Sequence, residues 1–152
     1  MNARPGFRFF VILLLLLTAL PAVAKELPKD LEEKLASSEF VYISSTRKDG
    51  TLSRPAEIWF LWFKGSVYVA SAPTTWRVRR IRWGRPQAKI WIGKPDGPSF
   101  TATGAVVDEP EARTALLETF AKKYESGWKR WEESFRTGLA DGGRVLVRYT
   151  PN

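Results

Sequence analysis

The chain has 152 residues and a formal net charge of +8, and it contains neither histidine nor cysteine. These absences exclude a disulfide, a thiolate nucleophile, a Ser–His catalytic pair and an ordinary zinc site. The chemistry that remains is that of a cofactor with its own reactive group, or binding of an anionic partner.

The first 24 residues have the pattern of a secretory signal peptide. Two arginines precede an apolar run over residues 9–20, and Ala22-Val23-Ala24 fits a cleavage site before Lys25. The pattern predicts export by the Sec route to the periplasm or the exterior, and one mature domain over residues 25–152. The alternative is an uncleaved anchor, but the apolar run is short of the roughly 20 residues that span a bilayer.

Hydrophobic periodicity and turn residues predict nine further elements after a short first helix. In chain order, we expect a helix over 29–36, strands over 40–46, 52–63 and 66–72, a helix over 76–83, strands over 88–92 and 99–107, a helix from Pro110, a second helix after an interruption at Gly127 and before Gly138, and a strand over 144–149. The tight turns make the first three strands an antiparallel meander, and Gly104 marks a bulge or a close approach. This order predicts a mainly β (α+β) fold, a closed barrel of six strands with a short basic helix and C-terminal helices at its rim.

Residues 72–93 combine positive charge with aromatic side chains. They contain five arginines, one lysine and three tryptophans, and no acid. Thr74 and Thr75 at a helix start, followed by Arg77, offer hydroxyl donors, a helix dipole and a guanidinium to a phosphate group. The alternative is that the threonines only cap the helix. Arg79, Arg82 and Arg85 exceed what one phosphate needs and are expected on a solvated face.

Five segments in order share the pattern of a known family. They are Ser-Thr-Arg-Lys-Asp-Gly, Arg-Pro-Ala-Glu-Ile-Trp-Phe, Val-Tyr-Val-Ala-Ser, the basic helix and Ala-Lys-Ile-Trp-Ile. Over residues 39–149 the chain resembles the pyridoxamine 5′-phosphate oxidase-like family of FMN-binding split barrels, which includes relatives that use a deazaflavin coenzyme. The resemblance implies a split β-barrel that forms a homodimer and holds its cofactor near the subunit interface.

The resemblance also implies which residues hold the cofactor. Matched by motif, the phosphate-binding residues are Arg47, Ser71, Thr74, Thr75 and Arg77, and the residues that line the isoalloxazine ring are Trp59 and Phe60. The short helix departs from the family pattern Lys-Val-x-Asn-Leu, because Arg80 stands at the asparagine position. Trp76 stands where deazaflavin relatives often have a tryptophan, so Arg80 and Trp76 complete the candidate set.

These features predict an exported, FMN-dependent oxidoreductase, with no substrate and no catalytic side chain singled out. The alternatives are a deazaflavin-dependent reductase and a barrel that binds an anionic ligand without a cofactor. Neither a metal nor a nucleic acid partner is expected, whereas weak association with an anionic membrane surface is compatible with export. Glu57 stands alone among apolar and basic residues and is expected to pair with an arginine.

Overall fold

A computed structural model describes residues 25–152. The elements are α1 (Lys29–Ser37), β1 (Val41–Ser45), β2 (Ala56–Ile58), β3 (Leu61–Phe63), β4 (Ser66–Ser71), α2 (Trp76–Arg82), β5 (Gln87–Ile92), β6 (Ser99–Val107), α3 (Pro110–Lys123), α4 (Glu125–Asp141) and β7 (Val145–Pro151). The predicted signal peptide lies outside the described residues. Within residues 25–152, no helix has the length and apolarity needed to cross a membrane.

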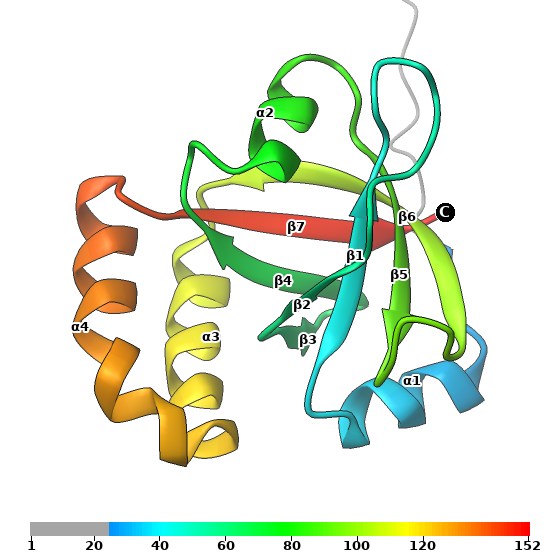
Figure 1. Ribbon diagram of the computed structural model, residues 1–152. Coiled ribbons are helices and arrows are strands. Elements are labelled where there is room, and N and C mark those ends of the chain that lie inside the picture. The colour runs from blue at the N-terminus through cyan, green and yellow to red at the C-terminus, as the bar shows by residue number, and fades with distance from the viewer. Residues whose placement is uncertain (1–24) are drawn as a thin grey trace, which may run out of the picture.

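All seven strands belong to one antiparallel sheet in the order β2-β1-β5-β6-β7-β4-β3. The two edge strands, β2 and β3, are separated in sequence only by Trp59 and Phe60. The sheet therefore curls until its edges are joined by this two-residue link, and α2, α3 and α4 lie around the rim (Figure 1). The predicted mainly β, barrel-like fold class is confirmed.

The prediction of one strand over residues 52–63 is wrong, and so is the continuous meander. Residues 56–58 pair with β1, whereas residues 61–63 pair with β4 on the opposite edge. Between them, Phe60 is buried with 1% exposure, and its N–H donates to the Tyr124 hydroxyl at 3.1 Å instead of to a neighbouring strand. Because this bond turns the chain out of the first ladder, the sheet has seven strands instead of the predicted six.

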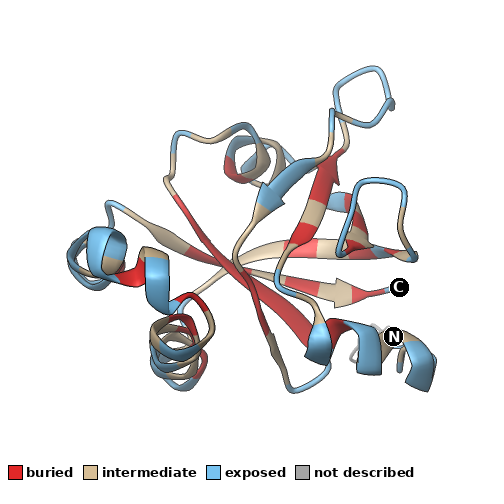
Figure 2. Ribbon diagram, turned by 60° about the horizontal axis from the view of Figure 1, so that its bottom comes forward, coloured by how far each residue is buried: buried red, intermediate tan, exposed pale blue. Residues whose placement is uncertain are grey.

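The core has two parts, one on each face of the sheet. In β4, Val67 and Val69 join the cluster inside the curl, and Tyr68 and Ala70 join the cluster beneath α3 and α4. This alternation follows the two-residue period of a strand. All six residues of β4 are buried, so this strand is covered along its whole length (Figure 2). The sheet is therefore covered on both faces where β4 crosses it.

Two predictions about glycines in the C-terminal helices are wrong. The interruption falls at Tyr124, between α3 and α4, and Gly127 lies inside the first turn of α4. A side chain at Gly127 would come within 3.0 Å of the Trp59 ring, so this glycine serves packing. Gly138 lies within α4, which ends instead at Gly142, where φ is +88°.

Candidate functional site

Two cavities lie on either side of Arg77, and both are lined by it. The first, here the arginine cavity, has a volume of about 390 Å³ and contains four guanidinium groups and no acid; it is lined by Ile43, Ser45, Arg47, Ser53, Arg54, Ala56, Thr75, Trp76, Arg77 and Arg80. The second, here the aromatic cavity, has a volume of about 420 Å³ and is lined by Glu57, Ile58, Trp59, Ala70, Ser71, Ala72, Thr75, Arg77, Trp131, Phe135 and Arg144. Thr75 and Arg77 are the residues that they share.

The arginine cavity is built from the end of β1, the β1–β2 loop and α2. Arg80 Nη1 donates to Ser45 Oγ at 2.7 Å, which ties α2 to the last residue of β1. Arg47 Nη1 donates to the Leu52 carbonyl at 2.6 Å and to Thr51 Oγ1 at 3.2 Å, which fixes the shape of the loop. Burial, together with repulsion from Arg47 and Arg85, lowers the pKa of Arg80.

Arg77 is the most desolvated charge of the site. Its Nη1 atom is buried and has no hydrogen-bond partner among the described residues, and burial lowers the pKa of the guanidinium. The hydroxyl of Tyr149 is also buried without a partner, and burial raises the pKa of this phenol. A buried donor without an acceptor destabilises the folded state unless a ligand or water supplies one.

Arg77 is positioned between the two cavities by the short helix α2 and the turn before it. Helix α2 has seven residues and buries Val78, and Thr75 stands at its N-cap position. The Thr75 hydroxyl donates to the Ala72 carbonyl at 2.9 Å and makes no bond to the helix itself. Gly84, with φ of +75°, follows the helix as expected from the sequence. The turn before α2 therefore supports the Arg77 side chain between the two cavities.

The aromatic cavity has a flat wall held by ring stacking. The Trp59 ring lies 4.3 Å from the Tyr124 ring with an angle of 3° between the planes, and 5.8 Å from the Phe135 ring. The Arg144 guanidinium lies over the Phe135 ring at 4.3 Å and donates to Ser134 Oγ at 3.0 Å. These contacts fix an aromatic surface and a positive charge, with Trp131 42% exposed beside them.

Seven of the nine candidate residues line one or both cavities. Arg47, Trp76 and Arg80 line the arginine cavity, Trp59 and Ser71 line the aromatic cavity, and Thr75 and Arg77 line both. The other two lie elsewhere. Phe60 is enclosed in the core with the Lys123 amine 3.7 Å from its ring centroid, and Thr74 is exposed to solvent.

Several lining residues were not among the candidates. Arg54 lies in the loop after β1, and the excess of basic residues over acids in this loop could have found it. Trp131 and Phe135 lie on α4 and Arg144 follows it, far along the chain from the other lining residues, and none of the three carries a local signal for this site. The expected pairing of Glu57 with an arginine is wrong for residues 25–152, because its carboxylate accepts a hydrogen bond from the Tyr42 hydroxyl and forms no ion pair there.

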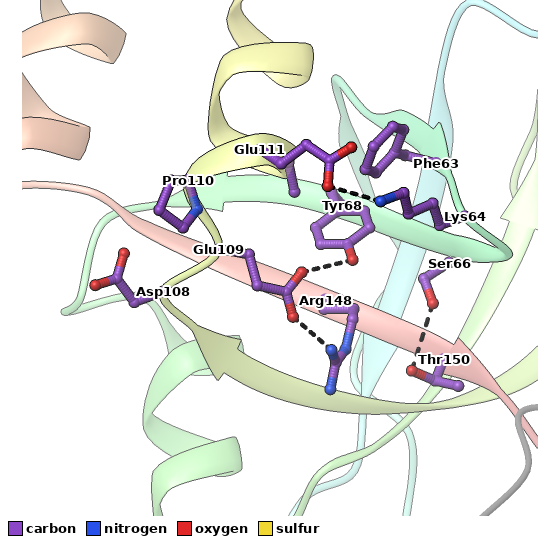
Figure 3. Close-up of a pocket in the computed structure, with 11 residues that line it drawn as sticks. Phe63, Lys64, Ser66, Tyr68, Asp108, Glu109, Pro110, Glu111, Arg148 and Thr150 are labelled. Carbon is purple, nitrogen blue, oxygen red and sulfur yellow. Dashed lines mark hydrogen bonds and ion pairs between the residues drawn. The ribbon is translucent and has the colours of Figure 1, made fainter.

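A third cavity of about 640 Å³ lies between the β3–β4 turn, the start of α3 and β7, and its charges satisfy one another (Figure 3). Glu109 accepts a hydrogen bond from the Tyr68 hydroxyl at 2.7 Å and forms an ion pair with Arg148. Lys64 forms a second ion pair, with Glu111, at 2.6 Å. Burial, and then the bond to Glu109, raise the pKa of Tyr68 to about 12. This network joins α3 to the sheet. The arginine cavity differs from it, because no acid there neutralises the four arginines.

Comparison with known proteins finds similarity in structure only. No family model matches the chain, and no curated protein matches it. Among solved structures, a Listeria innocua protein assigned as a pyridoxamine 5′-phosphate oxidase has a TM-score of 0.57 and 15% identity, covering 81% of this chain and 91% of its own. The fold is a split barrel of the pyridoxamine 5′-phosphate oxidase type.

Other solved structures with a similar fold are named for different cofactors. An F420 reductase has a TM-score of 0.55 and 19% identity, with 83% of this chain and 96% of that one covered. A heme storage protein from Vibrio cholerae has a TM-score of 0.51 and 15% identity, with 84% and 92% covered. The split barrel is therefore shown by these likenesses, whereas the cofactor must be argued from the site.

Proposed function

We propose that this split barrel binds FMN across the two cavities and acts as an FMN-dependent oxidoreductase. The observation that carries the proposal is Arg77, whose buried Nη1 lacks an acceptor where the two cavities adjoin. A phosphate dianion would supply that acceptor through a charge-assisted hydrogen bond. Desolvation strengthens such a bond, because little water competes for the guanidinium.

The donor sets of the two cavities fit the two ends of the cofactor. Arg47, Arg77 and Arg80 would hold the phosphate in the arginine cavity, which has no acid to compete for them. Trp59 would support the isoalloxazine ring in the aromatic cavity, because its own orientation is fixed by stacking on Tyr124. The residues present therefore suit a ligand with a dianion at one end and a flat ring at the other.

The bound flavin would supply the electron and hydride transfer, and the chain would supply position and electrostatics. Arg144 is held by Ser134 and carries its charge into the aromatic cavity, where it would orient an anionic group of a substrate. Glu57, hydrogen-bonded by Tyr42, is the one acid that lines this cavity.

A deazaflavin coenzyme is the second candidate. Four arginines line the arginine cavity, which is more than one phosphate requires, and Trp76 is 60% exposed there. A coenzyme with a longer acidic tail would use the additional guanidinium groups. The absorbance of the purified protein, or of the protein after titration with each coenzyme, distinguishes the two. Binding of neither would favour a cofactor-free barrel for an anionic ligand.

The decisive experiment compares FMN with riboflavin, which lacks the phosphate. Fluorescence titration should show that Arg77→Ala weakens FMN binding about ten- to a hundred-fold, the equivalent of one lost charge-assisted bond. Riboflavin binding should change little. Arg79→Ala is the matched control, because Arg79 is exposed on the same helix and lines neither cavity.

A separate measurement shows that Arg77→Ala still folds. Without ligand, its unfolding midpoint should equal or exceed that of the wild type, because Arg77 Nη1 has no partner to lose. If this folded variant keeps the wild-type preference for FMN over riboflavin, or if the wild type binds neither ligand, the proposed site is wrong.

A further inference from the structure

The positive charge of the described chain is concentrated at one end of the barrel. Residues 25–152 contain 22 basic and 16 acidic side chains, which gives a net charge of +6. Residues 46–55 and 72–86 together hold eight basic side chains and one acid, a net charge of +7, so the rest of the described chain carries −1. The eight are Arg47, Lys48, Arg54, Arg77, Arg79, Arg80, Arg82 and Arg85.

None of these eight side chains forms an ion pair within the described residues. The one acid, Asp49, accepts hydrogen bonds from the Thr51 hydroxyl and N–H. Arg47, Arg77 and Arg80 line the arginine cavity, but Lys48, Arg79 and Arg82 are exposed. The outward charges are therefore available to a partner outside the molecule.

Exposed apolar side chains lie at the same end. The described chain has four exposed large hydrophobic residues, and three belong to these segments: Leu52 at 40%, Trp76 at 60% and Trp83 at 55%. The β1–β2 loop and α2 project side by side from this end of the sheet (Figure 1), and the bond from Arg80 to Ser45 ties α2 to the residue of β1 after which the loop begins. We name this surface the barrel-end patch: Lys48, Leu52, Trp76, Arg79, Arg82 and Trp83.

The arrangement of the indoles discriminates between anionic partners. Arg79 and Arg80 lie over the Trp76 ring at 5.5 and 5.6 Å, and Arg85 lies over the Trp83 ring at 5.3 Å. The two indoles are tilted by 60° to each other and do not form a parallel platform. Bases of a single-stranded nucleic acid need free ring faces on which to stack, and here guanidinium groups lie over a face of each ring.

A bilayer surface fits the same features. Tryptophan is enriched where an apolar phase meets water, because its ring is apolar and its N–H is polar. Arginines attract anionic headgroups, and the exposed Leu52 adds apolar surface. We infer that the barrel-end patch docks on the surface of a bilayer that contains anionic phospholipids, independently of the cofactor proposed above.

The test measures co-sedimentation of the full chain with vesicles. One set contains phosphatidylcholine alone, and in the other part of it is replaced by phosphatidylglycerol. The apolar run over residues 9–20 can bind both kinds of vesicle alike. The measured quantity is therefore the ratio of the affinities for anionic and for neutral vesicles, in which that contribution cancels. The wild type should prefer the anionic vesicles, and high salt should abolish the preference.

Two matched double variants locate the surface. Arg79→Gln with Arg82→Gln should lower the preference for anionic vesicles about 25-fold, at roughly five-fold per basic residue. Lys122→Gln with Lys129→Gln removes the same charge from exposed positions on α3 and α4 and should leave the preference within about two-fold of the wild type. Trp83→Ser should weaken binding to anionic vesicles, with an unchanged unfolding midpoint as the check on folding.

Three outcomes would overturn the inference. The first is an equal loss of preference in both double variants, which would indicate a response to net charge alone. The second is tighter binding of a single-stranded oligonucleotide than of anionic vesicles, with the same dependence on Arg79 and Arg82. The third is a change in oligomeric state on Trp83→Ser, which would assign this surface to a second copy of the chain.

Discussion

At the scale of single residues, the pKa of the Lys123 amine is set by opposing effects of burial and of favourable neighbours. Burial lowers the pKa of its amine to about 8, and the charge of Glu39 opposes this shift. The Phe60 ring, with its centroid 3.7 Å from the amine, favours the charged form. The lowered pKa means that desolvation prevails over both, so the protonated amine destabilises the folded state.

This imbalance makes stability depend on pH in a defined direction. An unfolded lysine has a pKa of about 10.4, so the penalty is complete below about pH 8 and fades as the pH rises toward 10. Lys123→Met should therefore stabilise the protein most near pH 7, and its advantage over the wild type should shrink by about pH 9.5. Thermal unfolding at a series of pH values measures this difference.

Lys122→Met is the control, because Lys122 is exposed and should show no such trend. A difference between Lys123→Met and the wild type that does not vary with pH would mean that the amine is not penalised by burial.

Single residues of the candidate site were predictable where the signal is local. Thr75, Trp76 and Arg77 follow one another after a strand, and their hydroxyl, ring and charge are visible in three consecutive residues of the sequence. Arg144 reaches the aromatic cavity through the packing of α4, whose Ser134 holds the guanidinium, and no local pattern encodes this placement. Phe60 was misplaced because strand alternation cannot show which of two neighbouring aromatic rings turns into the core.

At the scale of elements, Gly104 determines how closely α2 approaches the sheet. A Cβ atom built there would lie 2.8 Å from the Tyr149 ring and 2.9 Å from Ile81 Cδ1. The close approach predicted from this glycine is confirmed. Since Ile81 belongs to α2, the absence of a side chain in β6 lets the helix that carries Arg77 rest directly on the barrel.

Gly104→Ala should destabilise the fold by about 1–3 kcal/mol through overpacking. Denaturant unfolding provides the measurement. Thr101→Ala, at an exposed position of the same strand, should change stability by less than about 0.5 kcal/mol. Equal stability of Gly104→Ala and the wild type would show that α2 can move away from the sheet without cost.

Most elements were predictable from periodicity and turn residues, and β6 and the start of α3 agree with their expected positions. The separation of β2 from β3 was not predictable, because residues 58–63 form one unbroken apolar run with no turn residue to divide it. The signal that divides them is a hydrogen bond from Phe60 to Tyr124, which lies 64 residues away. The break at Tyr124 was missed for a similar reason, since a glycine is the stronger local signal for a helix end.

At the scale of the whole molecule, we predict a homodimer, as the resemblance to split-barrel proteins implies. Trp131 on α4 is 42% exposed and lines the aromatic cavity, so a second copy could cover it there. Light scattering at micromolar concentration should give twice the chain mass, and Trp131→Glu should shift the protein toward the monomer by placing a charge in an apolar contact.

Lys129→Glu introduces the same side chain at an exposed position two residues earlier on another side of α4, and it should leave the dimer intact. A wild type that remains monomeric would contradict both the dimer and a cofactor site completed by a partner.

The position of β7 also governs when the protein can fold. This strand is the last in chain order, yet it lies inside the sheet, paired with β6 on one side and β4 on the other. Without residues 145–151, the remaining strand pairs leave two separate sheets, β2-β1-β5-β6 and β4-β3, each with an unpaired edge. Closure of the barrel must therefore wait until β7 pairs with both of them, and until then the unpaired edges can pair with other chains.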